Sequence, residues 1–202
     1  KLYGKEIPEL QKAGRYKEIV AAMLGEQGLN YGKKPKGLLL FHSYDDGART
    51  PVEEHLYEGK LIAAKENGEV NLHFTISPEH RVLFETLLAE KVPDIERKTG
   101  CKFNIGLSEQ KPKTDTVAAT PDNKPFRKAD GSILFRPGGH GALIENLNDI
   151  DADVIFVKNI DNIVPERLME DTVNYKKLLA GKLVSVQKQL FAELEALESG
   201  MP

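Results

Sequence analysis

Three short segments of the chain carry residue types suited to binding phosphate, a nucleotide base or a metal ion. The first, residues 33–37, holds three lysines beside Gly37. A lysine such as Lys36, held next to a glycine before an expected strand, can act as a point charge against phosphate oxygens. A solvated turn is the competing interpretation, and taken alone the lysine run is more typical of it.

The second segment, residues 136–143, gathers glycines around His140. Without side chains, Gly138, Gly139 and Gly141 would let backbone N–H groups approach a ligand closely at the start of a helix, where the helix dipole favours anions. His140 could donate a hydrogen bond to such a ligand or contact it with its ring face. A tight turn without any ligand is equally compatible with these residues.

The third segment, residues 159–162, follows an expected strand with the sequence Asn-Ile-Asp-Asn. At the carboxyl end of a strand in a parallel sheet, Asp161 would lie where ligands bind. Mg²⁺ takes one or two carboxylates and keeps several waters, so Asp161 with substrate oxygens suffices for a magnesium site. An Asx turn is the structural alternative. We expect Asp161 and the glycine turn around His140 to meet in one cleft.

The other reactive side chains form no recognisable set. The five histidines are scattered and lack the spacing of metal ligands. No Gly-x-Ser-x-Gly motif supports serine hydrolysis. The single cysteine, Cys101, rules out an internal disulfide and a cysteine-rich zinc site, which favours a reducing, cytoplasmic location.

Composition indicates one globular domain over residues 1–202, with 40% hydrophobic and 29% charged residues. The net charge of −3 argues against general binding of nucleic acid. No apolar run approaches the roughly 20 residues needed to cross a bilayer. The expected partners are therefore small molecules, and neither nucleic acid nor a membrane.

The elements expected to position the three segments are alternating strands and helices. Apolar runs predict buried strands at residues 38–41 and 154–157, and alternating apolar residues predict strands at 70–76 and 101–107. A helix over residues 51–66 begins with a Thr-Pro-Val-Glu capping box. Because strand–helix–strand connections of this length form right-handed parallel crossovers, we predict an α/β fold: a three-layer, mostly parallel, Rossmann-like sheet with helices on both faces.

Further helices are predicted at both ends of the chain and around an irregular excursion. Residues 108–131 have little periodicity, which is typical of a functional or mobile loop. Helices are expected over residues 8–24, after residue 77 with a break near Pro93, over 141–147, and in the C-terminal region 165–202 over 165–179 and 183–197, separated by Gly181.

Two of these motifs together resemble those of the UDP-sugar pyrophosphorylases, a family of nucleotidyltransferases. Pro-Gly-Gly-His-Gly-Ala-Leu at residues 137–143, with Val-Ile-Phe-Val-Lys-Asn-Ile-Asp-Asn at 154–162, is similar to the family's Pro-x-Gly-His-Gly turn and its strand ending in Asn-x-Asp-Asn. Gln110 and Pro112 resemble its Gln…Pro segment, and residues 35–55 resemble the Pro-Lys-x-Leu-Leu and Pro-x-x-x-His stretch of sugar-nucleotide transferases. The chain also resembles an uncharacterised bacterial family of domains of unknown function related to these enzymes.

The resemblance implies a fold like that of the nucleotide-diphospho-sugar transferases and gives roles to single residues. The nucleotide, with uracil as its base, would be contacted by Gln110, Gly138, Gly139, His140, Gly141 and Asn159. Asp161 would hold Mg²⁺ between the nucleotide and sugar phosphates. Lys36 would neutralise the triphosphate while a sugar 1-phosphate attacks the α-phosphate and pyrophosphate leaves. Lys36 and Asp161 would thus be the catalytic residues.

The family's glycine-rich triphosphate loop has no counterpart in residues 1–30, where Gly25 and Gly28 follow a helix. We therefore expect either a fragment that begins after that loop or a branch that has lost it. In the first case the chain is the nucleotidyltransferase-like part of a longer enzyme. In the second it is a non-catalytic nucleotide-sugar-binding or scaffold domain. A glycosyltransferase would need an Asp-x-Asp motif after a strand, whereas Asp151 and Asp153 precede one.

Overall fold

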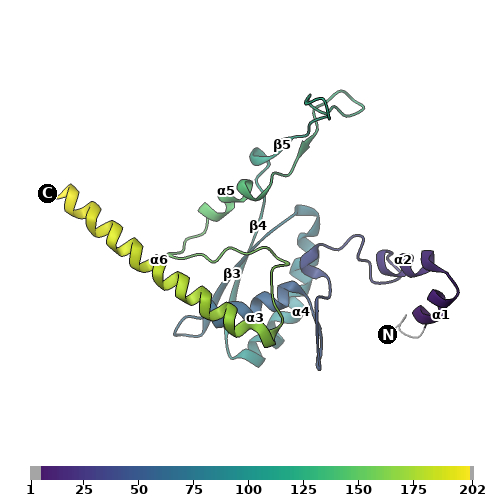
Figure 1. The fold of residues 1–202 in the computed structure, drawn as a ribbon, viewed down its shortest axis with the longest axis horizontal. Helices are drawn as coiled ribbons and strands as arrows, with labels where there is room; N and C mark the ends of the chain where they lie inside the picture. The colour runs from purple at the N-terminus through teal and green to yellow at the C-terminus, as the bar shows by residue number, and fades with distance from the viewer. Residues whose placement is uncertain (1–5, 201–202) are drawn as a thin grey trace.

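The computed structural model describes residues 6–200, except for the side chains of Glu6 and His140. Figure 1 shows how its elements are arranged. In chain order, with η denoting a 3₁₀ helix, they are α1 (Glu6–Lys12), α2 (Tyr16–Leu24), η1 (Lys36–Leu38), β1 (His42–Tyr44), β2 (Gly47–Arg49), α3 (Pro51–Ala63), β3 (Glu69–Ile76), η2 (Pro78–His80), α4 (Arg81–Thr99), β4 (Lys102–Glu109), η3 (Pro112–Thr114), β5 (Thr116–Val117), β6 (Phe135–Arg136), η4 (His140–Leu143), α5 (Ile144–Asn148), η5 (Glu166–Leu168) and α6 (Met169–Glu198).

The centre of the fold is the parallel pair formed by β3 and β4 (Figure 1). Its register runs from Glu69 opposite Lys102 to Ile76 opposite Glu109. The connection between the two strands contains α4, as a parallel crossover requires. The strands predicted at residues 70–76 and 101–107, and their parallel crossover, are confirmed.

Alternation along β3 and β4 sorts their side chains to two different faces. Val70, Phe74 and Phe103 are buried against apolar residues of α3 and α4. The opposite face carries polar side chains such as His73 and Asn104, which are exposed. The described strands form three two-stranded sheets. The α/β class is confirmed by the parallel pair and the helices that cover one of its faces. Residues 6–200 do not form the wide three-layer sheet that the sequence predicted. The other face of the parallel pair carries polar residues and is open to solvent.

Two predicted strands are absent from the described part of the chain. Within residues 38–41, Leu38 ends η1 and is buried in the core, and the chain then enters the β1–β2 hairpin. Residues 154–157 lie in the connection from α5 to α6 without strand pairing, and Val157 is 73% exposed. An apolar run predicts a buried strand only where a neighbouring strand offers its backbone groups, and none of the described strands does so here.

The start of α3 matches its prediction. The side chain of Thr50 accepts a hydrogen bond from the backbone N–H of Glu53, and Glu53 in turn accepts one from the backbone N–H of Thr50. α4 differs from its prediction, because it continues through Pro93 without a break. Phe84 and Ile95, on either side of the proline, are both buried, so core packing holds the two halves of α4 in line.

The helices at the two ends of the chain also differ from the predictions. Gly14, with a φ of +68°, separates α1 from α2, where one helix was expected. The two predicted C-terminal helices form one helix, α6, which passes through Gly181. A helical glycine costs only about 1 kcal/mol relative to alanine, which does not suffice to end a long helix. No helix within residues 6–200 combines the length and the apolar character that crossing a bilayer requires.

Candidate functional site

Lys36 and Asp161 form an ion pair although 125 residues separate them in the chain. The Lys36 Nζ lies 2.8 Å from Oδ2 of Asp161, and their side chains are 73% and 44% exposed. The hydrogen bond raises the pKa of the Lys36 ammonium and lowers the pKa of the Asp161 carboxyl, so both groups are charged at neutral pH. The two residues expected to be catalytic thus lie together on an open surface that a ligand can reach.

Gly37 lets η1 lie directly on the segment that carries Asp161. A Cβ at this buried glycine would meet Ile160 Cγ1 and Phe84 Cζ, each at 3.1 Å. The missing side chain of Gly37 therefore lets η1 approach Ile160 more closely than another residue would. Lys36 therefore projects from a rigid base beside the Asp161 turn.

His55 fixes the turn from the other side. Its Nε2 lies 3.0 Å from the backbone carbonyl oxygen of Ile160. Burial lowers the pKa of His55, so the imidazole is neutral at pH 7 and donates its N–H to this carbonyl. A backbone bond from Asn162 N to the carbonyl oxygen of Asn159 closes the turn at 3.0 Å. Asn159 is itself held by a further interaction in the structure.

A buried carboxylate, Glu58, anchors the segment just before the turn. It accepts hydrogen bonds from Lys158 at 2.8 and 2.9 Å and from Lys176 of α6 at 2.7 Å. Burial favours the neutral acid, but the two lysines outweigh it and lower the pKa of Glu58. Burial also lowers the pKa of Lys158. Glu58 was missed in the sequence, although its place three residues after His55 puts both on one face of α3.

A second buried acid, Glu54, binds the β1–β2 hairpin to α3. Its Oε1 accepts a hydrogen bond from the Tyr44 hydroxyl at 2.6 Å and lies 3.0 Å from His42 Nδ1. Burial and the bond to Glu54 raise the pKa of Tyr44 to about 12. The guanidinium of Arg49 stacks over the Tyr44 ring at 4.0 Å. The cluster connects β1, β2 and α3, although Oε2 of Glu54 is buried without a hydrogen-bond partner.

The glycine turn packs against the segment that follows β4. A Cβ at Gly138 would meet the carbonyl oxygen of Thr114 at 2.8 Å and would lie 3.6 Å from Gln110 Nε2. The Gln110 amide donates to Asp115 at 3.3 Å. Gly139 and Gly141 differ from Gly138, since a Cβ at either would meet no atom within 4 Å. The side chain of His140 lies outside the described structure.

Asn146 holds α5 against the end of β4, next to the glycine turn. Its amide donates to Ser108 Oγ at 2.9 Å and to the carbonyl oxygen of Glu109 at 2.8 Å. Ser108 Oγ also lies 2.8 Å from His73 Nε2 on β3. No motif in the sequence indicates this network, because its members are neighbours only after the two strands have paired.

The predicted site residues therefore fall into two groups. Lys36, Asp161 and Asn159 belong to the surface formed by η1 and the turn before α6. Gln110 and the glycine turn belong to the surface formed by the end of β4, η3 and η4. In Figure 1 the second group lies beside α5 and β5, whereas the segment leading to α6 runs from there to the side of α3 and α4.

The carboxylate of Asp161 could hold Mg²⁺ only together with oxygens from a bound ligand and from water. The described residues contain no cluster of three or more His, Cys, Asp or Glu side chains that could hold a metal ion. Asp161 offers one exposed carboxylate, which in this structure faces Lys36. Magnesium is commonly bound by one or two carboxylates with phosphate and water oxygens, so Asp161 fits an ion that arrives with a phosphorylated ligand.

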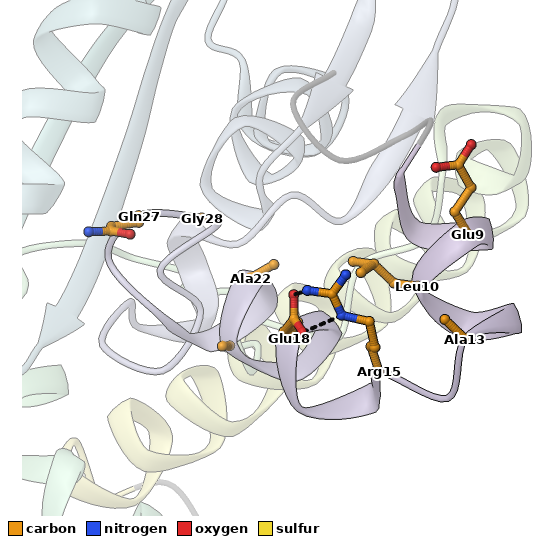
Figure 2. Close-up of a pocket in the computed structure, with 9 residues that line it drawn as sticks. Glu9, Leu10, Ala13, Arg15, Glu18, Ala22, Gln27 and Gly28 are labelled. Carbon is orange, nitrogen blue, oxygen red and sulfur yellow. Dashed lines mark hydrogen bonds and ion pairs between the residues drawn. The ribbon is translucent and has the colours of Figure 1, made fainter.

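A shallow hollow between α1, α2 and the turn after α2 contains none of the predicted site residues (Figure 2). Arg15 and Glu18 form an ion pair at its edge, with 2.5 Å between the guanidinium and the carboxylate. Leu10, Ala13 and Ala22 supply apolar lining.

Comparison with known proteins yields one family. The model described as a domain of unknown function, DUF4301, matches residues 1–202. The expected likeness to an uncharacterised domain family is thereby confirmed. No curated protein and no solved structure matches the chain.

Proposed function

The chain belongs to the DUF4301 family, and we propose that it binds a nucleoside triphosphate or nucleotide sugar with Mg²⁺ and carries out nucleotidyl transfer like that of the UDP-sugar pyrophosphorylases. The observation that carries the proposal is the 2.8 Å pairing of Lys36 with Asp161. A cation for phosphate and a carboxylate for magnesium are what such a reaction needs side by side.

The frame beneath this pair supports the proposal. Gly37 packs on Ile160, and His55 holds the Ile160 carbonyl. Glu58 binds the turn through Lys158. A functional pair that is exposed while its supports are buried is typical of a preorganised binding site, because the ligand then meets groups that need little reordering.

The proposed chemistry relies on alignment and charge. An oxygen of the sugar 1-phosphate forms a bond to the α-phosphorus, the bond from that phosphorus to the oxygen bridging the β-phosphate breaks, and its electron pair leaves with pyrophosphate. Lys36 would neutralise the triphosphate oxygens. Magnesium, when bound at Asp161, would reduce the repulsion between the two phosphate groups. An exposed ion pair such as Lys36–Asp161 is weak in water. A phosphate can therefore replace Asp161 beside Lys36, and a metal ion can replace Lys36 beside Asp161, with little loss of free energy.

The remaining contacts of the proposal rest on the resemblance. The turn formed by Gly138, Gly139, His140 and Gly141 would contact the base, and Gln110 and Asn159 would contact the nucleotide. Gly139 and Gly141 are the positions where a ligand could approach the backbone, because the space around their Cα atoms is open. A wider, mostly parallel sheet around β3 and β4 would complete the nucleotidyltransferase architecture.

A second candidate, a nucleotide-sugar-binding domain without turnover, is favoured by how the glycines after α2 are used. The Gly25 N–H donates to the carbonyl oxygen of Ala21 at 2.8 Å, and the Gly28 N–H donates to that of Gly25 at 3.0 Å. A Cβ at Gly28 would overlap the Ala22 carbonyl oxygen. These glycines end a helix, so their amides are not available to hold a triphosphate.

Calorimetry with UTP and a UDP-sugar, each with and without Mg²⁺, tests binding. We expect Asp161→Asn to lose the effect of Mg²⁺ and Lys36→Met to weaken binding at least tenfold. Lys33→Met is the matched control, because Lys33 pairs with Glu26 outside the proposed site. No heat with the unaltered protein, or an unchanged Mg²⁺ effect in Asp161→Asn, would overturn the proposal.

Pyrophosphate release from UTP and a sugar 1-phosphate separates the two candidates. Release that needs Lys36 and Asp161 supports the transferase. Binding that needs both residues, with no release, supports the non-catalytic domain.

A further inference from the structure

The C-terminal helix α6 leaves most of its length without a partner. Its first turns pack on α3, where Met169 and Val173 are buried. Lys176 reaches Glu58 of α3. Beyond that point α6 projects away from the rest of the fold (Figure 1).

An apolar stripe runs along this projecting part. Its members recur every three or four residues, as one face of a helix requires. They are Leu179, Leu183, Val186, Leu190, Leu194 and Leu197, which are between 45% and 69% exposed. The stripe begins three residues after Lys176, so it continues the face that packs on α3. An apolar stripe of this length on an exposed helix marks an interaction surface.

Charges along the projecting part are segregated by sign. Lysines lie in its first half and at its centre, namely Lys177, Lys182 and Lys188. Its second half carries glutamates, namely Glu193, Glu195 and Glu198. A helix of this kind is complementary to a copy of itself that runs in the opposite direction, whereas a parallel copy would place like charges beside one another.

We propose that α6 pairs with α6 of a second copy of this chain, in an antiparallel, two-fold symmetric arrangement. In the register that aligns the two stripes, Leu179 faces Leu197 of the other copy and Val186 faces Leu190. Lys177 then lies opposite Ser199, next to Glu198. Lys182 likewise lies opposite the segment that contains Glu193 and Glu195. Such an interface is isologous, since each contact occurs twice. Antiparallel helix dipoles also attract one another.

Sedimentation equilibrium of the whole chain tests the pairing. We expect a dimer that Leu190→Asp converts to a monomer. Because Leu190 is 55% exposed, the variant should keep its far-ultraviolet circular dichroism, which shows that the fold is intact. A monomer at every concentration of the unaltered protein, or a dimer that Leu190→Asp leaves intact, would overturn the proposal.

Charge reversal tests the register. Lys182→Glu should raise the dissociation constant several-fold, and adding Glu193→Lys should restore it. Lys188→Glu is the matched control. In the proposed register Lys188 faces Lys188 of the second copy, so the substitution replaces a lysine–lysine pair by a glutamate–glutamate pair and should leave the dissociation constant nearly unchanged. If the double variant dissociates as readily as Lys182→Glu, the proposed register is wrong.

A cysteine at the end of the stripe tests the direction. In a Cys101→Ser background, Leu179→Cys would form a disulfide between copies in a parallel pair. In the antiparallel pair the two cysteines lie at opposite ends, so oxidation should leave the chains unlinked. Efficient cross-linking at this position would contradict the antiparallel arrangement.

Discussion

The imidazole of His55 donates to the backbone carbonyl oxygen of Ile160, 105 residues further along the chain, at 3.0 Å. Ile160 immediately precedes Asp161, so a residue of α3 sets the position of a carboxylate that lies in a connection without strand or helix. The proposed site therefore depends on the buried face of α3 as much as on the exposed residues themselves.

The first prediction concerns pH. Burial lowers the folded-state pKa of His55 below its ordinary value of 6.5. As the pH falls, His55 therefore takes up a proton at a higher pH in the unfolded chain than in the folded chain. The contribution of His55 to the free energy of unfolding is full above pH 6.5 and is lost as the pH falls from 6.5 through the folded-state pKa. His55→Gln, which keeps an N–H donor but does not titrate, should reduce this loss in urea unfolding measured at several pH values.

The matching control is His73→Gln. The pKa of His73 is also lowered by burial, but this side chain lies on the exposed face of β3. Its replacement should remove a smaller part of the acid sensitivity. An identical pH profile for the unaltered protein and His55→Gln would contradict the role given to His55.

The second prediction concerns the buried carboxylate. Glu58→Gln leaves Lys158 and Lys176 without their counter-charge and should lower the free energy of unfolding by about 3 kcal/mol. Lys158→Met should cost less, because Glu58 still pairs with Lys176. Glu90→Gln, at an exposed ion pair with Lys91, is the surface control. A loss in Glu58→Gln no larger than in the control would refute the claim that this cluster anchors the turn.

The third prediction concerns the start of α3. Thr50→Ala removes the hydroxyl that accepts from the Glu53 N–H and should destabilise the protein by about 1 kcal/mol. Thr50→Ser keeps the acceptor and should cost markedly less. Thermal unfolding of the three proteins measures the difference. Equal losses in both variants would mean that the methyl group of Thr50, which is 4% exposed, matters more than its cap.

The fourth prediction separates two adjacent glycines. Gly138→Ala places a Cβ against the Thr114 carbonyl and Ala142, at 2.8 and 2.7 Å, so the turn must shift and stability should fall by about 1–3 kcal/mol. Gly139→Ala meets no atom within 4 Å and has a φ of −75°, so it should be nearly neutral. Hydrogen exchange of the turn and urea unfolding compare the two. Equal behaviour of the two variants would show that Gly138 does not pack as described.

The two glycine variants also bear on the proposed function. Should nucleotide binding be established, a loss of affinity in Gly139→Ala without a loss of stability would identify a ligand approach to the backbone. The same loss in Gly138→Ala would carry no such meaning, because that substitution disturbs the fold.

Local signals in the sequence determined the elements whose hydrogen bonds or burial patterns are complete within a short segment. The capping box at Thr50 forms within four residues. The alternation of apolar and polar residues at 70–76 predicts a strand with one buried and one exposed face, and it does so without knowledge of the neighbouring strand. The paired lysine and aspartate, Lys36 and Asp161, were both singled out by their neighbours in the chain.

Only the tertiary structure decided which of these segments meet. The apolar runs at residues 38–41 and 154–157 lack strands because strand formation needs a partner's backbone, which no short segment can specify. The bonds of Glu58, Glu54 and Asn146 connect distant elements, so they leave no local pattern. Tertiary packing likewise carries α4 through Pro93. A sequence encodes local preferences at each position, whereas contacts between distant positions depend on how all of those preferences are satisfied together.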